Sequence, residues 1–155
     1  MFKPRRFKAP ARNFACGWVT ALLFVSPLAA QNVISPDDLV ALALMNLDLV
    51  DRGGSGAVWD DASSLFKGKT SRETFVSTIA KSRPSFRGAP ARSWSGVTRA
   101  VLGDENPGGM PAGVYAKILF FPRMVGGKNT TEQIGFRLDT DERWRMTGYE
   151  YTVLP

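Results

Sequence analysis

Apolar side chains recur every three or four residues between residues 36 and 52, which is the spacing of one face of an α-helix. Ser35-Pro36 precedes this pattern and supplies a capping hydroxyl and a proline suited to the first helical position. Gly53 follows it and readily takes the left-handed conformation that ends helices. The apolar stripe is wide, so we expect this helix to be covered on more than one side.

Two shorter helical patterns follow. The first spans residues 57–66, with Trp59 on its apolar face, and the second begins after a capping Ser71. Arg83-Pro84 ends the second, because the residue before a proline is pushed out of the helical region. The inward-facing residues expected in the second are Phe75, Val76, Ile79 and Ala80.

After Pro90 the pattern changes to short β-favouring runs, several of them with alternating apolar and polar positions. The expected strands span residues 92–102, 114–121, 133–138 and 144–153. A tight hairpin at 139–143, a turn at 126–128 and a longer, mobile loop at 103–113 connect them. This order predicts an α+β fold in which three N-terminal helices pack on a curved four-stranded antiparallel meander.

The first 30 residues differ from the rest. Five basic residues and no carboxylate are followed by an almost wholly apolar run from Ala15 to Leu28 and then by small residues. This order is typical of a signal peptide, and we expect cleavage between Ala30 and Gln31. Residues 31–155 then form a single periplasmic or secreted domain. The alternative is an uncleaved membrane anchor, although the apolar run is shorter than the roughly 20 residues that span a bilayer.

Charge gives no reason to expect a nucleic-acid partner. The chain has 20 basic and 14 acidic residues, a formal net charge of +6. Five of the basic residues lie in the expected signal, so 15 basic and 14 acidic residues remain after it. The expected partner is therefore an envelope protein or a small ligand, with membrane contact only if the signal is retained.

The residues available for catalysis are few. The sequence has no histidine, and its one cysteine, Cys16, lies in the expected signal. This excludes histidine-dependent triads, thiol nucleophiles and most zinc or copper sites, so we expect no catalytic, cofactor-binding or metal-binding residues. Acidic pairs occur at Asp37-Asp38, Asp60-Asp61, Asp104-Glu105 and Asp141-Glu142. We interpret the first two as helix starts and the others as solvated loop residues.

Aromatic and basic residues supply candidates for binding. Three tryptophans form either a ligand wall or part of the core, and we expect Trp59 and Trp144 to be core residues. Arginines form either an anion site at the mouth of a cone or a solvated face. The tryptophans are Trp59, Trp94 and Trp144, and the arginines are Arg83, Arg92 and Arg99.

Asp48 is the acid nearest to an apolar setting, since it lies between Leu47 and Leu49 on the first helix. Either burial raises its pKa, as an enzyme would require, or an arginine from the sheet pairs with it. The binding candidates are Asp48, Trp59, Arg83, Arg92 and Tyr149.

Several short runs, taken in order, resemble one family. They are Leu49-Val50-Asp51-Arg52-Gly53, Trp59, Ala62-Ser63-Ser64-Leu65-Phe66, Arg83-Pro84 and Trp144-Arg145-Met146-Thr147-Gly148-Tyr149. Together they resemble the domain of unknown function 4019 family over Ala41 to Tyr151. The resemblance implies an exported bacterial protein with a fold similar to the cystatin-like or NTF2-like cone. It implies no known reaction and no catalytic residues.

Three classes of function stay open. The first is a periplasmic recognition module that binds a protein or a small ligand. The second is a cone-fold enzyme that uses Asp, Glu or Tyr as acid or base without a metal, and the third is an envelope accessory protein tethered by its uncleaved signal. We expect binding, because acid–base work without histidine needs a carboxyl group in an apolar pocket.

Overall fold

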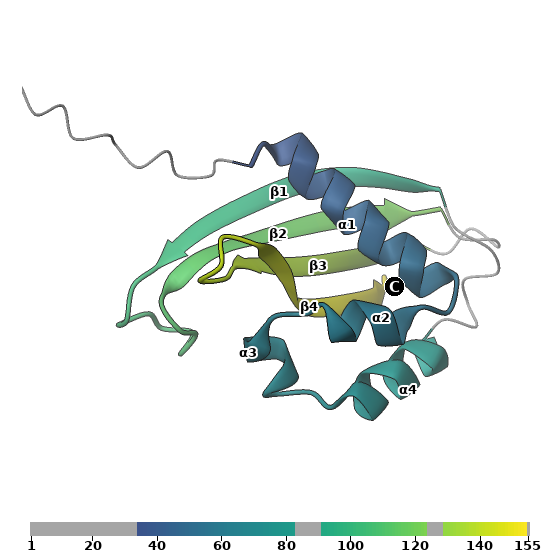
Figure 1. Ribbon diagram of the computed structural model, residues 1–155. Helices are drawn as coiled ribbons and strands as arrows, with labels where there is room; N and C mark the ends of the chain where they lie inside the picture. Colours follow the sequence, from purple (N-terminus) through teal and green to yellow (C-terminus); the bar gives the residue numbers. More distant parts are fainter. Residues whose placement is uncertain (1–33, 83–90, 124–128, 155) are drawn as a thin grey trace, which may run out of the picture. The chain divides into compact units, whose positions relative to one another are not determined.

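Helices precede strands along the chain, as predicted (Figure 1). The structure is a computed structural model that describes residues 34–82, 91–123 and 129–154. The expected signal peptide, its cleavage point, Arg83-Pro84 and the turn at 126–128 lie outside the described residues. The helices are α1 (Pro36–Asp51), α2 (Ser55–Asp60), α3 (Ser64–Lys67) and α4 (Arg72–Ser82). None of the helices in these ranges is long and apolar enough to span a membrane.

Helix α1 has the boundaries that the sequence indicates. The Ser35 hydroxyl accepts a hydrogen bond from the Asp38 backbone N–H at 3.1 Å, and the Asp38 carboxylate accepts one from the Ser35 N–H at 3.2 Å. This capping box satisfies two of the backbone groups left over at a helix start. At the other end Gly53 has a φ of 81°, a conformation that glycine adopts without strain.

The second predicted helix is wrong, because the chain breaks it into α2 and α3. Between them the Ser63 N–H donates to the carbonyl of Met146, in the last strand, at 2.9 Å. Ser63 takes an extended conformation to do so (φ −58°, ψ 146°), and its hydroxyl accepts from the Leu65 N–H at 3.4 Å. The described residues therefore contain four helices rather than three.

The break also overturns the interpretation of one acidic pair. Asp60 and Asp61 lie at the C-terminal end of α2 rather than at a helix start, so the helix dipole does not favour them there. Instead, Arg72 donates to Asp60 at 2.9 Å and Arg143 donates to Asp61 at 3.4 Å.

Helix α4 begins as predicted, since the Thr74 N–H donates to the Ser71 hydroxyl at 3.1 Å. Phe75 and Ile79 are buried and Val76 is half-buried, as expected. Ala80 is exposed, which corrects its predicted place on the inward face.

The strands form the predicted antiparallel meander, in the order β1-β2-β3-β4. Their bounds are β1 Arg92–Leu102, β2 Gly113–Pro122, β3 Thr130–Leu138 and β4 Trp144–Val153. The β3–β4 hairpin closes through Asp139 N–H to Arg143 C=O at 2.9 Å. Strand β3 starts at Thr130, three residues before the predicted start. The apolar pattern did not include Thr130 and Glu132 because both are polar, yet both are buried on the inner face.

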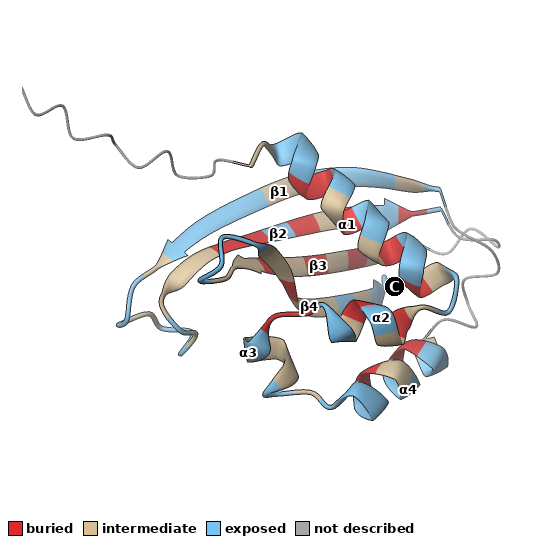
Figure 2. Ribbon diagram, viewed as in Figure 1, coloured by how far each residue is buried: buried red, intermediate tan, exposed pale blue. Residues whose placement is uncertain are grey.

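The core lies between the sheet and the helices. Helix α1 crosses β1 and β2, and α3 contacts β4 (Figure 1). Buried positions alternate along β2 and β3 and recur on the sheet-facing side of α1 (Figure 2). The largest fully buried apolar side chains are Leu39, Leu47, Ile118, Phe120, Ile134 and Phe136. This inner face holds the fold together, since apolar burial is the main favourable contribution to folding.

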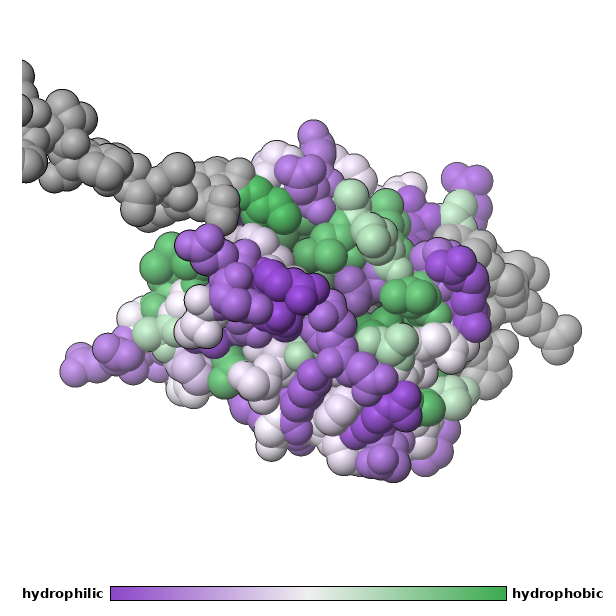
Figure 3. Space-filling model, in the orientation of Figure 1, coloured by the Kyte–Doolittle hydropathy of each residue, from purple (hydrophilic) through white to green (hydrophobic). Residues whose placement is uncertain are grey.

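The surface on the helix side is mixed in character. Figure 3 shows apolar patches along α1, where Leu44, Met45 and Leu49 are exposed, and hydrophilic side chains near the β3–β4 hairpin and α4. Isolated apolar residues on a surface are ordinary and do not by themselves indicate a binding site.

Candidate functional site

A group of charged side chains is buried where α1 meets the sheet. Arg92, at the start of β1, has only 5% of its side chain exposed. It donates to Asp51 at 2.6 Å and 3.1 Å and to Glu132 at 2.5 Å and 3.3 Å. Asp51 ends α1 and Glu132 lies in β3, so one guanidinium joins three elements of the fold.

Tyr149 completes this group, which we call the Arg92 cluster: Asp51, Arg92, Glu132 and Tyr149. The Tyr149 hydroxyl donates to Glu132 at 2.7 Å. The contact arises from sheet geometry, because Tyr149 on β4 is a diagonal neighbour of Glu132 on the same face. Glu132 is fully buried and is held by both a cation and a hydroxyl.

Burial and hydrogen bonding act in opposite directions on Arg92. Burial alone would lower the pKa of the guanidinium, but hydrogen bonds from Arg92 to Asp51 and Glu132 outweigh it and raise the pKa. Arg92 therefore stays charged near neutral pH. This suits the cluster to anchoring α1 on the sheet.

The sequence pointed to half of this cluster. Arg92 and Tyr149 were binding candidates, and the structure brings them together around Glu132. The interpretation of Arg92 as part of a solvated face is wrong, because Asp51 and Glu132 draw it into the interior. Sequence reasoning missed Glu132. It lies two residues before Ile134, so the alternation of Ile134, Phe136 and Leu138 also places Glu132 on the inner face.

Asp48 is not the acid that pairs with the sheet. Its side chain is 52% exposed and forms an ion pair with Arg52, one turn later on the same helix. The sheet arginine instead reaches Asp51, almost one turn further along α1. The expected ion pair between α1 and an arginine of the sheet therefore exists, but its carboxylate belongs to Asp51 and not to Asp48.

The other candidates have separate surroundings. Trp59 is half-buried against the core, and its ring N–H donates to the Thr70 carbonyl at 2.8 Å. Trp144 is also half-buried against the core, under the Arg99 guanidinium at 5.6 Å from the ring centre. Trp94 is 53% exposed on β1. Arg83 lies outside the described residues.

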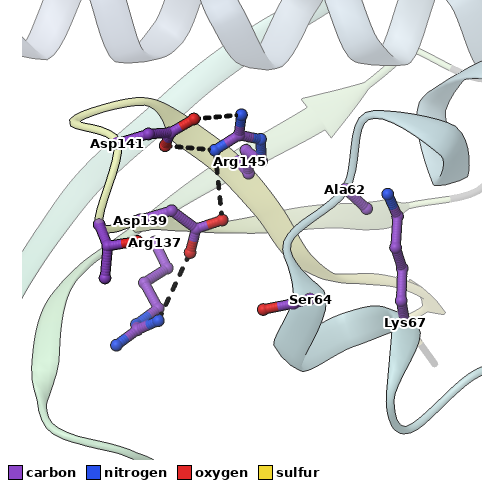
Figure 4. A pocket seen from close by; sticks show the side chains of 8 residues that line it. Ala62, Ser64, Lys67, Arg137, Asp139, Asp141 and Arg145 are labelled. Carbon is purple, nitrogen blue, oxygen red and sulfur yellow. Dashed lines mark hydrogen bonds and ion pairs between the residues drawn. The ribbon is translucent and has the colours of Figure 1, made fainter.

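A polar pocket of about 410 Å³ lies between the β3–β4 hairpin and α3 (Figure 4). It is lined by Ala62, Ser64, Lys67, Arg137, Asp139, Thr140, Asp141 and Arg145. Sequence reasoning missed this pocket, because its two sides are about 70 residues apart in the chain and come together only in the folded protein, through contacts such as Ser63 with Met146 and Asp139.

Ion pairs fix the hairpin side of the pocket. Arg145 donates to the two oxygens of Asp141 at 2.5 Å and 2.6 Å, and Asp139 lies between Arg137 and Arg145 at 3.4 Å and 3.5 Å. The Ser63 hydroxyl also donates to Asp139 at 2.9 Å. These hydrogen bonds from Arg145 lower the pKa of Asp141 to about 2, so its carboxylate is ionised near neutral pH.

Lys67 lines the opposite side of the pocket and, unlike the two arginines, does not pair with an aspartate of the hairpin. Its ammonium donates to the Asp60 backbone carbonyl at 2.5 Å and lies 5.4 Å from the centre of the Trp59 ring. Within the described ranges no carboxylate forms an ion pair with Lys67. Three cations and two carboxylates therefore line the pocket, which leaves one positive charge in excess.

Fold and site together define a small α+β domain in which helices precede an antiparallel sheet, with a charged pocket at the β3–β4 hairpin. The chain belongs to the family described as "Protein of unknown function (DUF4019)", whose model matches residues 42–149. No curated protein and no solved structure matches the chain significantly. Within the described ranges no group of three or more His, Cys, Asp or Glu side chains is placed to hold a metal ion.

Proposed function

We propose that this protein is an exported recognition module that binds a small anionic ligand in the polar pocket between α3 and the β3–β4 hairpin. The single observation that carries the proposal is the excess of one positive charge in the pocket lining, because Lys67 lines the pocket and no carboxylate among the described residues forms an ion pair with it. The two aspartates of the pocket are already engaged by Arg137 and Arg145.

Preorganisation supports binding at this site. The ion pairs on the hairpin and the Ser63 hydrogen bond hold the polar groups before any ligand arrives. A ligand that meets fixed groups loses less free energy to ordering them. The volume of the pocket also lies within the range of roughly 300 to 1,000 Å³ that is usual for small-molecule sites.

The Arg92 cluster favours binding over catalysis. A carboxyl group that exchanges protons with a substrate must reach it, whereas Glu132 is fully buried and accepts hydrogen bonds from Arg92 and Tyr149. We therefore assign these side chains to anchoring the helix. The order of basic, apolar and small residues in residues 1–30 supports export to the periplasm. We also propose that sheet and helices form the cystatin-like or NTF2-like cone implied by the family.

The test is a titration of the purified protein in which the backbone amide signals are monitored by NMR. Inorganic phosphate is added as the anion in one titration and tetramethylammonium as the cation in another. Phosphate should shift the signals of Ser64, Thr140 and Asp141, and tetramethylammonium should not. Lys67→Gln should weaken phosphate binding about tenfold, because one charge-assisted hydrogen bond is lost.

Lys69→Gln is the matched control, since Lys69 is exposed two residues away and does not line the pocket. It should leave phosphate binding unchanged. Equal weakening by the two variants, or no shift at Ser64 and Thr140, would overturn the proposal.

A further inference from the structure

The outer face of the sheet, which points away from the helices, holds a second pocket with different chemistry. Its volume is about 400 Å³. Side chains of this face alternate with core residues, so Lys117 lies between the buried Ala116 and Ile118. The polar pocket at the hairpin shares no lining residue with it, and nothing below rests on the proposed function.

The β1–β2 connection builds one wall of this pocket. The Asn106 side chain bonds to Gly103 and Met110, donating to the Met110 carbonyl at 2.6 Å and accepting from its N–H at 3.2 Å. The Tyr115 hydroxyl donates to the Pro111 carbonyl at 2.7 Å. These bonds place Met110 beside Tyr115 and Leu102 as an apolar wall.

Small residues form the floor of the pocket. Ala100 on β1 and Gly135 on β3 lie on either side of β2, and neither fills the space above the sheet. A Cβ on Gly135 would lie 3.2 Å from the Thr147 hydroxyl, so the absence of a side chain helps to keep the floor open.

Among the described residues that line this pocket, only Lys117 is charged. It is exposed, and among the described residues no carboxylate forms an ion pair with it. An apolar cavity that ends at one available cation is complementary to a molecule with an apolar body and an anionic head.

From this geometry we propose that the outer-face pocket binds a small amphipathic acid, with its apolar body between Met110 and Gly135 and its anionic head on Lys117. The apolar part of the ligand is removed from water by Leu102, Met110 and Tyr115. The head pairs with the ammonium at the pocket's edge.

The experiment uses octanoate, octanol and octylammonium, which share a chain and differ in head-group charge. Binding is followed on the purified protein through the labelled methyl groups of Met110 and Leu102. Octanoate should shift both signals and bind about tenfold more tightly than octylammonium. It should leave the amides of Ser64 and Thr140 unshifted, which separates this site from the polar pocket.

Two variants test the two halves of the proposal. Lys117→Gln should weaken octanoate binding about tenfold and leave octanol binding unchanged. The matched control is Lys81→Gln, which changes an exposed lysine on α4 and should alter neither. Ala100→Phe fills the floor and should abolish the binding of both ligands while the remaining amide spectrum stays native.

Three outcomes would overturn the proposal. In the first, octanoate does not shift Met110. In the second, Lys117→Gln and Lys81→Gln behave alike. In the third, the Met110 signal shifts with protein concentration while light scattering reports a dimer, which would make a second copy of the chain the occupant of this face.

Discussion

At the scale of single residues, whether a charged side chain is buried or exposed depends on the helix or strand that packs against it. Asp48 and Asp51 are three residues apart on α1, yet Asp48 is exposed beside Arg52 and Asp51 is buried beside Arg92. Only the second pair is removed from water, so only its disruption leaves an unpaired charge in the interior, which is strongly destabilising.

Replacing Arg92 should therefore cost far more than replacing Arg52. Arg92→Met leaves Asp51 and Glu132 in the interior without the guanidinium between them, and should lower the free energy of unfolding by about 3 to 5 kcal/mol. Arg52→Met breaks the exposed pair and should cost about 1 kcal/mol or less. Urea denaturation of the two variants makes the comparison, and similar losses would refute the role given to the Arg92 cluster.

At the scale of elements, short sequence patterns predict the features of helices and strands that depend on neighbouring residues. The Ser35 cap, Gly53 and the alternation of Ile134 and Phe136 all act within a few residues, and α1 and the core of β3 are found where they indicate. The break between α2 and α3 depends on the carbonyl of Met146, more than 80 residues later, and no pattern within 57–66 contains it. The same long-range contact forms the polar pocket, which is why the sequence did not reveal that site.

The β3–β4 hairpin should lose stability in acid. Hydrogen bonds from Arg145 lower the pKa of Asp141 from 3.8 to about 2, so ionised Asp141 favours the folded state. This contribution is complete above about pH 5 and is lost as the pH falls towards 2, because the unfolded chain takes up the proton first.

Asp141→Asn provides the comparison, since it removes the titrating group and keeps its shape. The difference in unfolding free energy between the wild-type protein and this variant should be constant from pH 7 to about pH 5 and should shrink from there to pH 2. A difference that does not vary over this range would show that Arg145 gives the carboxylate no preference for the folded state.

At the scale of the whole molecule, the order of helices and strands was predictable from the sequence. Which acidic and basic side chains form ion pairs was not. Alternation and turn residues indicated an α+β chain with an antiparallel meander, and the strands occur in that order. The Arg92 cluster and the polar pocket each join segments that are distant in sequence, so their charges acquire partners only after the chain has folded. The polar pocket, on which the proposed binding rests, was therefore harder to infer from the sequence than the fold.

Export is the last property to test, and it concerns the chain before it folds. Five basic residues, an apolar run and the small pair Ala29-Ala30 occur in the order that a signal peptidase requires. Intact-mass spectrometry of the periplasmic fraction should therefore find a chain that begins at Gln31. Ala30→Arg places a large cation at the cleavage point and should leave the full-length chain in the membrane fraction. A wild-type chain that begins at Met1 in that fraction would instead support the tethered accessory protein, because an uncleaved apolar segment holds its domain at the membrane.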